Sequence, residues 1–267
     1  CLCVAALAVA SAHADAAGHR ASERARTWLD AHGGVDAVVA RMYSDSDQTA
    51  VYLAMAGLAD ADALPNPELI ASLVPPMLVA MQMKINAGVI MGLFAMGFIT
   101  RHLRKQKRAR VPLVGPLVAR FDPLWPVHEA EAIACRKYMK QFQNPNGNWD
   151  GNTVQSALYV AGLFASGLTT KSSTLRVAIE WLDAQKRYDK DGMHMRVFTC
   201  ENWMTSFALR ALLRSGVDRE DPRIDRALRY LVSAQITTDM PAVDQRQRGV
   251  QRRGGWGFQP TNPTMPD

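Results

Sequence analysis

Apolar residues recur at helical spacing along most of the chain, and short segments rich in Gly, Pro, Ser or Asp separate these stretches. No stretch sustains an alternation of apolar and polar residues, so strands are not expected beyond short turns. The spacing predicts helices over residues 22–31, 36–42, 47–56, 128–142, 153–166, 173–185, 201–215 and 223–235. The pattern therefore predicts an all-α protein.

Candidate capping residues mark the expected ends of some of these helices. Ser22 takes the N-cap position of the first predicted helix, and Gly57 follows the third. Asp221 takes the N-cap position of the last helix, followed by Pro222 at the first helical position, where its missing N–H costs no hydrogen bond. These signals predict where the first and last helices begin and where the third ends.

The most apolar run of the chain covers residues 77–100. Polar residues interrupt its first half, and the longest uninterrupted part is residues 87–99. A helix that spans a bilayer needs ~20 apolar residues, so this run is too short. We expect a buried helix instead, in which Gly88, Gly92 and Gly97 allow a neighbouring helix to approach closely.

A basic run over residues 101–110 follows directly and holds six Lys or Arg residues. It could attract anionic lipid headgroups, at ~1 kcal/mol per charge near the membrane surface. It could equally be a solvated loop. Nucleic acid is not an expected partner, because no aromatic residues are interleaved with the charges.

A glutamine closes three of the predicted helices, at Gln143, Gln185 and Gln235, in steps of 42 and 50 residues. Each step has room for two helices and two loops. After the first glutamine come a Pro-Asn-Gly turn ending at Gly147 and then Trp149. Such a period is typical of repeat architectures, so the chain is predicted to be an array of helix pairs.

The other two copies are altered. The third is interrupted by an insertion over residues 236–253 before it reaches Gly254 and Trp256. The middle copy has Gly192 but carries Met193 where a tryptophan is expected.

A fainter copy lies at residues 25–34, with His32 in the place of the glutamine. A glutamine at a helix end can bond to free backbone groups of the next helix, while the tryptophan packs on the neighbouring turn. The unit is therefore predicted to staple one helix to the next, a structural role.

Composition adds further bounds. The net charge is +6 and the pI near 9.3, which suits an anionic membrane or another polyanion, although charge alone does not choose between them. The four cysteines, Cys1, Cys3, Cys135 and Cys200, form no zinc-binding spacing with the six histidines. We expect structural thiols in a reducing compartment, and neither a metal site nor a cofactor.

The opening segment, residues 1–14, resembles the apolar region of a signal peptide with a small-residue cleavage site. No basic segment precedes it in the sequence, and alanine and leucine are strong helix formers. A truncated helix is the favoured interpretation.

Two segments carry a resemblance to a known family. Residues 140–149, KQFQNPNGNW, resemble the QW repeat of the triterpene cyclases, and residues 254–267 resemble the segment that leads into their acidic motif. Further similar blocks lie at residues 26–40, 64–69 and 203–216. The similarity is closest to the bacterial squalene-hopene cyclases, begins near residue 20, and is most specific in the terminal block.

The resemblance implies an (α/α) barrel of helix-pair repeats with QW motifs. On this scheme residues 1–198 form a truncated inserted barrel, and residues 199–267 form the first helices of the catalytic barrel. It also implies a peripheral, monotopic enzyme on the cytoplasmic side of the cell membrane, and a homodimer is a further hypothesis.

The reaction implied by the resemblance is the proton-initiated cyclisation of squalene, or another linear polyprenoid, to hopanoid-type products. A carboxylic acid protonates a terminal alkene, and aromatic faces stabilise the migrating cation by ~2 kcal/mol or more in a dry pocket.

Three residues match the motifs that carry this chemistry. Asp267 falls at the first Asp of the family's Asp-x-Asp-Asp motif, whose remaining acids would lie beyond residue 267, so these 267 residues alone are expected to be inactive. Phe258 matches an aromatic that stabilises a ring cation, and Trp203 matches another cavity aromatic. Plain core packing is the alternative role for both. The resemblance assigns structural roles to Gln143, Gly147, Trp149, Gln185, Gln235 and Trp256.

Some positions depart from the family pattern. A cavity tryptophan expected near residues 84–87 is missing, and Met204 stands where an Asp commonly follows the cavity tryptophan. These departures leave two alternatives to squalene cyclisation open: a class II cyclase of another polyprenoid, and a non-catalytic helical binding or scaffold module.

Overall fold

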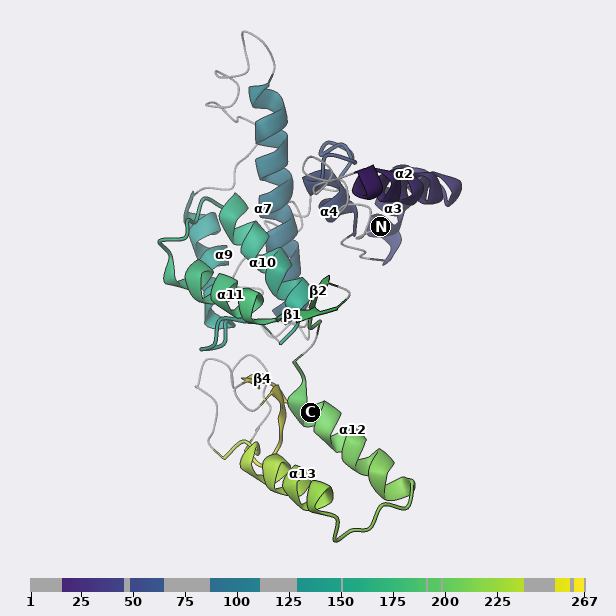
Figure 1. Cartoon of the computed structure of the whole chain (residues 1–267). Helices are drawn as coiled ribbons and strands as arrows, with labels where there is room; N and C mark the ends of the chain where they lie inside the picture. The colour runs from purple at the N-terminus through teal and green to yellow at the C-terminus, as the bar shows by residue number, and fades with distance from the viewer. Residues whose placement is uncertain are drawn as a thin grey trace. The chain divides into compact units, whose positions relative to one another are not determined.

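The computed structural model describes residues 16–45, 49–64, 87–110, 129–149, 151–190, 192–197, 199–237, 253–259 and 262–266. Most of these residues are helical, as the sequence predicts (Figure 1). The chain divides into two compact units, one of residues 1–73, 93–132 and 161–167, the other of residues 74–92, 133–160 and 168–267.

The helices are α2 (Ala16–Ala31), α3 (Gly34–Asp45), α4 (Thr49–Met55), α7 (Ala87–Ala109), α9 (Glu129–Gln141), α10 (Thr153–Ala165), α11 (Ser173–Ala184), α12 (Glu201–Arg214) and α13 (Pro222–Ser233). The strands are β1 (Lys186–Asp189), β2 (Gly192–Met195), β3 (Gly257–Gln259) and β4 (Asn262–Pro266).

Helices α2, α3 and α4 belong to the first unit. Helix α4 ends as predicted beside Gly57, whose φ of 72° lets the N–H of Leu58 reach the carbonyl of Leu53 at 2.9 Å. The prediction for Ser22 is wrong, because α2 already begins at Ala16. Ser22 lies inside the helix and is 7% exposed.

Helix α7 does not stop at residue 100 but continues to Ala109, through the basic run. A solvated loop at residues 101–110 is therefore wrong. The physical reason is composition, since Arg, Lys, Gln and Ala all favour helix and no Gly or Pro interrupts them. None of the helices that the structure describes is long and apolar enough to cross a membrane.

Helices α7 and α10 touch at two places. In the second unit, the Tyr159 hydroxyl donates to the carbonyl of Gly88 at 2.9 Å. In the first unit, a Cβ on Gly162 would lie 2.5 Å from the Cα of Ala95, closer than atoms can pack. Gly88, Gly92 and Gly97 are buried as expected, yet the glycine that this tight contact requires lies on α10.

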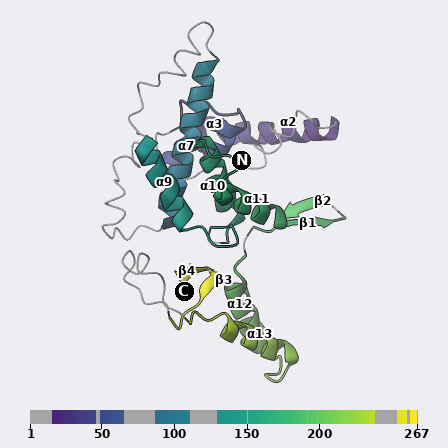
Figure 2. The same ribbon diagram turned by 90° about the vertical axis from the view of Figure 1, so that its left-hand side faces the viewer.

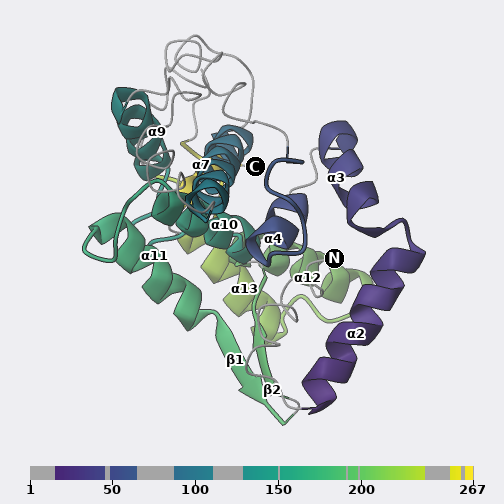
Figure 3. The ribbon, with the colours of Figure 1, turned by 90° about the horizontal axis from the view of Figure 1, so that it is seen from above.

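Two antiparallel hairpins correct the expectation of no strands beyond short turns. Strands β1 and β2 extend beyond α11 (Figure 3), and β3 pairs with β4 near α12 and α13 (Figure 2). The first hairpin is exposed along nearly its whole length. Neither face of it is buried, so its sequence carries no apolar alternation that could predict strands.

Several predicted features lie outside the described residues. They are the opening helix at residues 1–14, Cys1 and Cys3, the missing cavity tryptophan near residues 84–87, most of the insertion, and Asp267.

Candidate functional site

The first repeat turn joins α9 to the loop before α10. The Gln143 side-chain amide donates to the carbonyl of Gly147 and to that of Thr174 in α11, both at 2.9 Å. The indole N–H of Trp149 donates to the carbonyl of Met139 at 2.8 Å. The glutamine thus connects α9 not to the next helix but to α11.

Trp149 and Gly147 are tightly packed within this turn. Trp149 is fully buried and meets Tyr159 edge to face, with ring centroids 5.6 Å apart. Gly147 has a φ of 100°, and a Cβ there would lie 2.2 Å from the carbonyl oxygen of Val177. Glycine is required at this position both by the backbone conformation and by the close approach of α11.

The third repeat turn has two of these side-chain hydrogen bonds at shifted positions. Gln235 donates to the carbonyl of Gly254 at 2.7 Å, and the Trp256 indole donates to that of Leu231 at 2.6 Å. In both turns the tryptophan bonds to the carbonyl four residues before the glutamine.

The backbone bonds of the two turns also match. The N–H of Asn144 bonds to the carbonyl of Asn148 at 2.9 Å, as that of Ile236 bonds to Gly255 at 2.9 Å. The N–H groups of Gly147 and Gly254 then bond to Asn144 and Ile236, both at 2.8 Å. The third turn therefore keeps the backbone hydrogen bonds of the first turn despite the insertion in its sequence.

The middle copy and the faint copy use a different side chain for the hydrogen bond that the tryptophan makes in the other two copies. Neither has a tryptophan after the turn, and the carbonyl that such an indole would contact is bonded by the side chain at the glutamine position itself. Gln185 donates to the carbonyl of Trp181 at 2.9 Å, and His32 Nδ1 lies 2.7 Å from that of Trp28. Since a carbonyl only accepts, the second contact requires a proton on His32 Nδ1.

The candidate reactive residues lie on α12 and the β3–β4 hairpin. Trp203 is half-buried in the first turn of α12 and meets Phe207 edge to face at a centroid distance of 6.2 Å. Phe258 lies in β3, where the structure describes its backbone. Pro266, the residue before Asp267, is the register partner of Gly257.

A buried asparagine joins these elements. Asn202 is 1% exposed, and its Nδ2 donates to the carbonyl of Gly257 at 2.7 Å. Its Oδ1 accepts from the Tyr230 hydroxyl of α13 at 2.9 Å. Burial, and after it the Glu201 carboxylate, raises the pKa of Tyr230, so this hydroxyl stays protonated and can donate.

Each of the three candidate residues is the next residue in the sequence after Asn202, Gly257 or the residue paired with Gly257. Trp203 follows Asn202, Phe258 follows Gly257, and Asp267 follows the register partner of Gly257. Sequence reasoning missed Asn202 and Tyr230. No local sequence signal marks Asn202 as buried, since Thr205 and Ser206, three and four residues further along α12, are polar as well.

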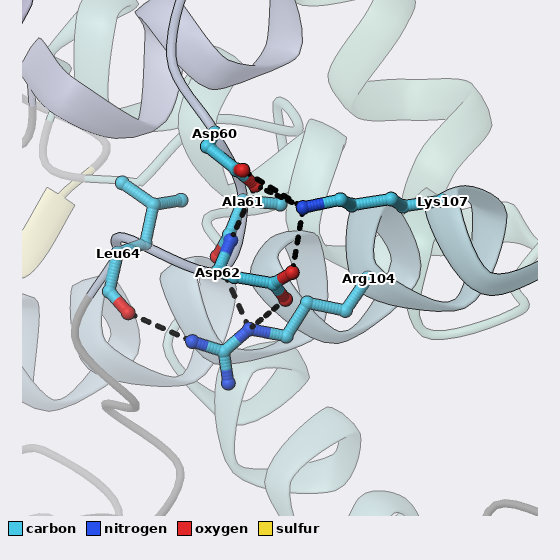
Figure 4. Close-up of polar contacts among 6 residues, drawn as sticks. All are labelled: Asp60, Ala61, Asp62, Leu64, Arg104 and Lys107. Carbon is cyan, nitrogen blue, oxygen red and sulfur yellow. Dashed lines mark hydrogen bonds and ion pairs between the residues drawn. The ribbon is translucent and has the colours of Figure 1, made fainter.

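Two cations of the basic run are engaged within the first unit (Figure 4). Lys107 Nζ lies 2.7 Å from a carboxylate oxygen of each of Asp60 and Asp62. Arg104 donates to the carbonyls of Ala61 at 3.1 Å and Leu64 at 2.8 Å. The hydrogen bond from Lys107 lowers the pKa of Asp60, and both carboxylates raise the pKa of Lys107. These two cations hold the loop after α4 against α7.

Comparison with known proteins finds similarity in the terminal part of the chain. Residues 199–267 match the family model described as the squalene-hopene cyclase C-terminal domain. Enfumafungin synthase of Hormonema carpetanum is 25% identical over 158 residues, which are 58% of this chain and 12% of that protein. The resemblance to the terpene cyclases is confirmed. The matched residues begin shortly before α12 and include Asn202, Tyr230 and both strands of the terminal hairpin.

Proposed function

We propose that this chain is part of a class II terpene cyclase that closes the rings of a linear polyprenoid by protonating a terminal alkene. The family match over residues 199–267 carries the proposal. The geometry adds support, because Trp203 and the hairpin that holds Phe258 and leads to Asp267 are joined through one buried asparagine.

Within this proposal, each candidate residue has a role. Asp267 is the first carboxyl group of the acidic motif that donates the proton. Phe258 and Trp203 present aromatic faces to the cation as it migrates, in a site from which water is excluded. The glutamine and tryptophan residues of the turns hold the helices of a QW-type (α/α) barrel. Residues 1–198 belong to an inserted barrel, and residues 199–267 begin the catalytic one.

Squalene is the proposed substrate, with hopanoid-type triterpenes as products. The protein is proposed to lie on the cytoplasmic surface of the cell membrane, where such an apolar substrate is dissolved, and to form a homodimer. A cyclase of another polyprenoid is the second candidate, which Met204, in place of the common Asp beside the cavity tryptophan, favours.

The test uses the natural protein that contains these residues together with a complete acidic motif. Incubation with squalene in detergent, followed by gas chromatography and mass spectrometry, is expected to yield pentacyclic products, and Asp267→Asn to abolish most of them while circular dichroism stays unchanged. Cyclisation of another polyprene but not squalene would overturn the substrate. A protein that cyclises no polyprene would overturn the cyclase proposal in favour of a binding or scaffold module.

A further inference from the structure

Strand β3 has an unusual pairing partner. Gly257 lies opposite Pro266 in the antiparallel register, and proline has no N–H. Pro266 therefore cannot donate to the carbonyl of Gly257, which is buried and needs a hydrogen-bond donor from elsewhere. Asn202 Nδ2 supplies that donor from α12, at 2.7 Å.

The orientation of the Asn202 amide is fixed by its two partners. The carbonyl of Gly257 can only accept, so the amide nitrogen must face it. The amide oxygen then faces Tyr230, whose hydroxyl donates at 2.9 Å. With the two side-chain atoms exchanged, the amide oxygen would face the carbonyl of Gly257, and that carbonyl would lose its donor.

The carbonyl of Gly257 belongs to the same planar peptide unit as the N–H of Phe258. A side chain that fixes this carbonyl also fixes the direction in which the chain enters Phe258. Through the register of Gly257 with Pro266, it fixes how β4 pairs with β3.

We propose that Asn202 and Tyr230 are positioning residues that hold the β3–β4 hairpin, and with it the backbone of Phe258, in the geometry that cyclisation requires. This inference rests on the proposed cyclase function for its catalytic consequence. The clamp itself is a property of the described residues. It consists of one buried amide that joins α12, α13 and β3.

The test exchanges only the donor. Asn202→Asp keeps the shape of the side chain and can still accept from Tyr230, but an ionised carboxylate cannot donate to the carbonyl of Gly257. A protonated carboxyl group can. Position 202 is buried, and burial disfavours the ionised form of an acid introduced there and so raises its pKa. The variant is therefore expected to lose the clamp at neutral pH and to regain it as the pH is lowered.

Amide hydrogen exchange of Gly257–Gln259 in the 267-residue chain measures the clamp, with protection expressed relative to the exchange of an unprotected chain at the same pH. Asn202→Asp should reduce protection by about 10- to 100-fold at pH 7, the range expected when a buried acceptor loses its donor. Protection should recover on acidification. Asn202→Ala should lose protection at every pH, and Tyr230→Phe should give a smaller, pH-independent loss.

Asn152→Asp is the matched control. Asn152 Oδ1 accepts from the N–H groups of Val154 and Gln155 at 3.0 and 3.1 Å at the start of α10, and an ionised Asp accepts equally well. This variant should leave the protection of Gly257–Gln259 unchanged at all pH values. Unchanged protection in both Asn202 variants would overturn the clamp.

The catalytic consequence is read in the natural protein with its complete acidic motif. Asn202→Asp should lower kcat at pH 7 by about 10-fold or more with little change in KM, and the ratio of variant to wild-type kcat should rise on acidification in parallel with exchange protection. Lost protection with an unchanged kcat would overturn the positioning role. A wild-type protein without cyclase activity would overturn the proposed function and the positioning role for catalysis, while the exchange result would still decide the clamp.

Discussion

The first and third repeat turns share the hydrogen bonds that close the turn but differ in what surrounds them. Trp149 is fully buried, whereas Trp256 is half-buried, and Gln143 has a second bond, to Thr174, in addition to the one it shares with Gln235. The local sequence therefore sets the backbone path of each turn. How much each turn contributes to stability depends on which helix packs against it.

The insertion sharpens this comparison. The turn closes from Asn144 to Gly147 in the first copy and from Ile236 to Gly254 in the third, through equivalent bonds. Loop-closure entropy grows only slowly with loop length, so an insertion at this point costs little as long as both ends of the turn are held. The glutamine and the tryptophan hold those ends.

Replacing the two tryptophans should give the largest contrast. Trp149→Ala removes a fully buried ring with its edge-to-face contact and its bond to Met139, and should cost about 3–5 kcal/mol of unfolding free energy. Trp256→Ala should cost about half as much or less, because its ring is partly exposed already. Urea unfolding followed by circular dichroism measures both. Equal losses would show that the turns are energetically alike.

The two turn glycines test the same contrast through the backbone. Both have positive φ, 100° and 93°, so alanine at either site costs roughly 1–2 kcal/mol. Gly147→Ala adds a clash with the Val177 carbonyl, whereas the space around Gly254 is open. We expect Gly147→Ala to cost about 2–4 kcal/mol in urea unfolding and Gly254→Ala no more than the strain alone. A Gly147→Ala protein as stable as Gly254→Ala would mean that α11 can move away without cost.

The sequence predicted the helical class and most helix limits, because each depends on signals carried by a few neighbouring residues. The end of α4 at Gly57 and the start of α13 at Asp221 and Pro222 are confirmed for that reason. The Ser22 prediction failed because a good capping residue also fits inside a helix when it is buried.

The candidate site was less accessible from sequence. Trp203 and Phe258 could be named from the resemblance, but Asn202 could not, since its partners Gly257 and Tyr230 lie 55 and 28 residues away. Likewise, nothing local indicates that Lys107 binds a loop 47 residues earlier. Long-range polar contacts have no periodic signature, so only the fold reveals them.

The two glutamines should give a smaller difference. Gln143→Ala leaves the carbonyls of Gly147 and Thr174 without their side-chain donor in a partly buried place, at a cost of about 1–3 kcal/mol. Gln235→Ala should cost less than about 1 kcal/mol, because water can replace its bond to the exposed Gly254. Thermal unfolding of both variants, read by circular dichroism, would contradict the comparison if Gln235→Ala were the more harmful.

The smallest effect on stability should come from the N-terminal caps of α11 and α13, the helices that belong to the first and third turns. Helix α11, which packs on the first turn, begins after Ser172 without a side-chain cap bond, whereas Asp221 caps α13 by accepting from the N–H of Arg223 at 2.8 Å. Hydrogen bonds from the Arg223 side chain and from its N–H lower the pKa of Asp221 from 3.8 to about 2. A lowered pKa in the folded state means that the ionised carboxylate stabilises the fold at any pH above 3.8, and that this stabilisation is lost as the pH falls toward 2.

Asp221→Asn keeps a cap that can accept but removes the ion pair with Arg223, so it should lower the melting temperature slightly at pH 5. The difference from wild type should shrink as the pH is lowered to 2, where the wild-type carboxyl group becomes protonated. Ser172→Ala, which removes no cap bond, should show no such pH dependence. If the difference in melting temperature between Asp221→Asn and wild type stays constant down to pH 2, the charge of Asp221 does not stabilise α13. Helix α13 would then resemble α11, whose start has no side-chain cap bond.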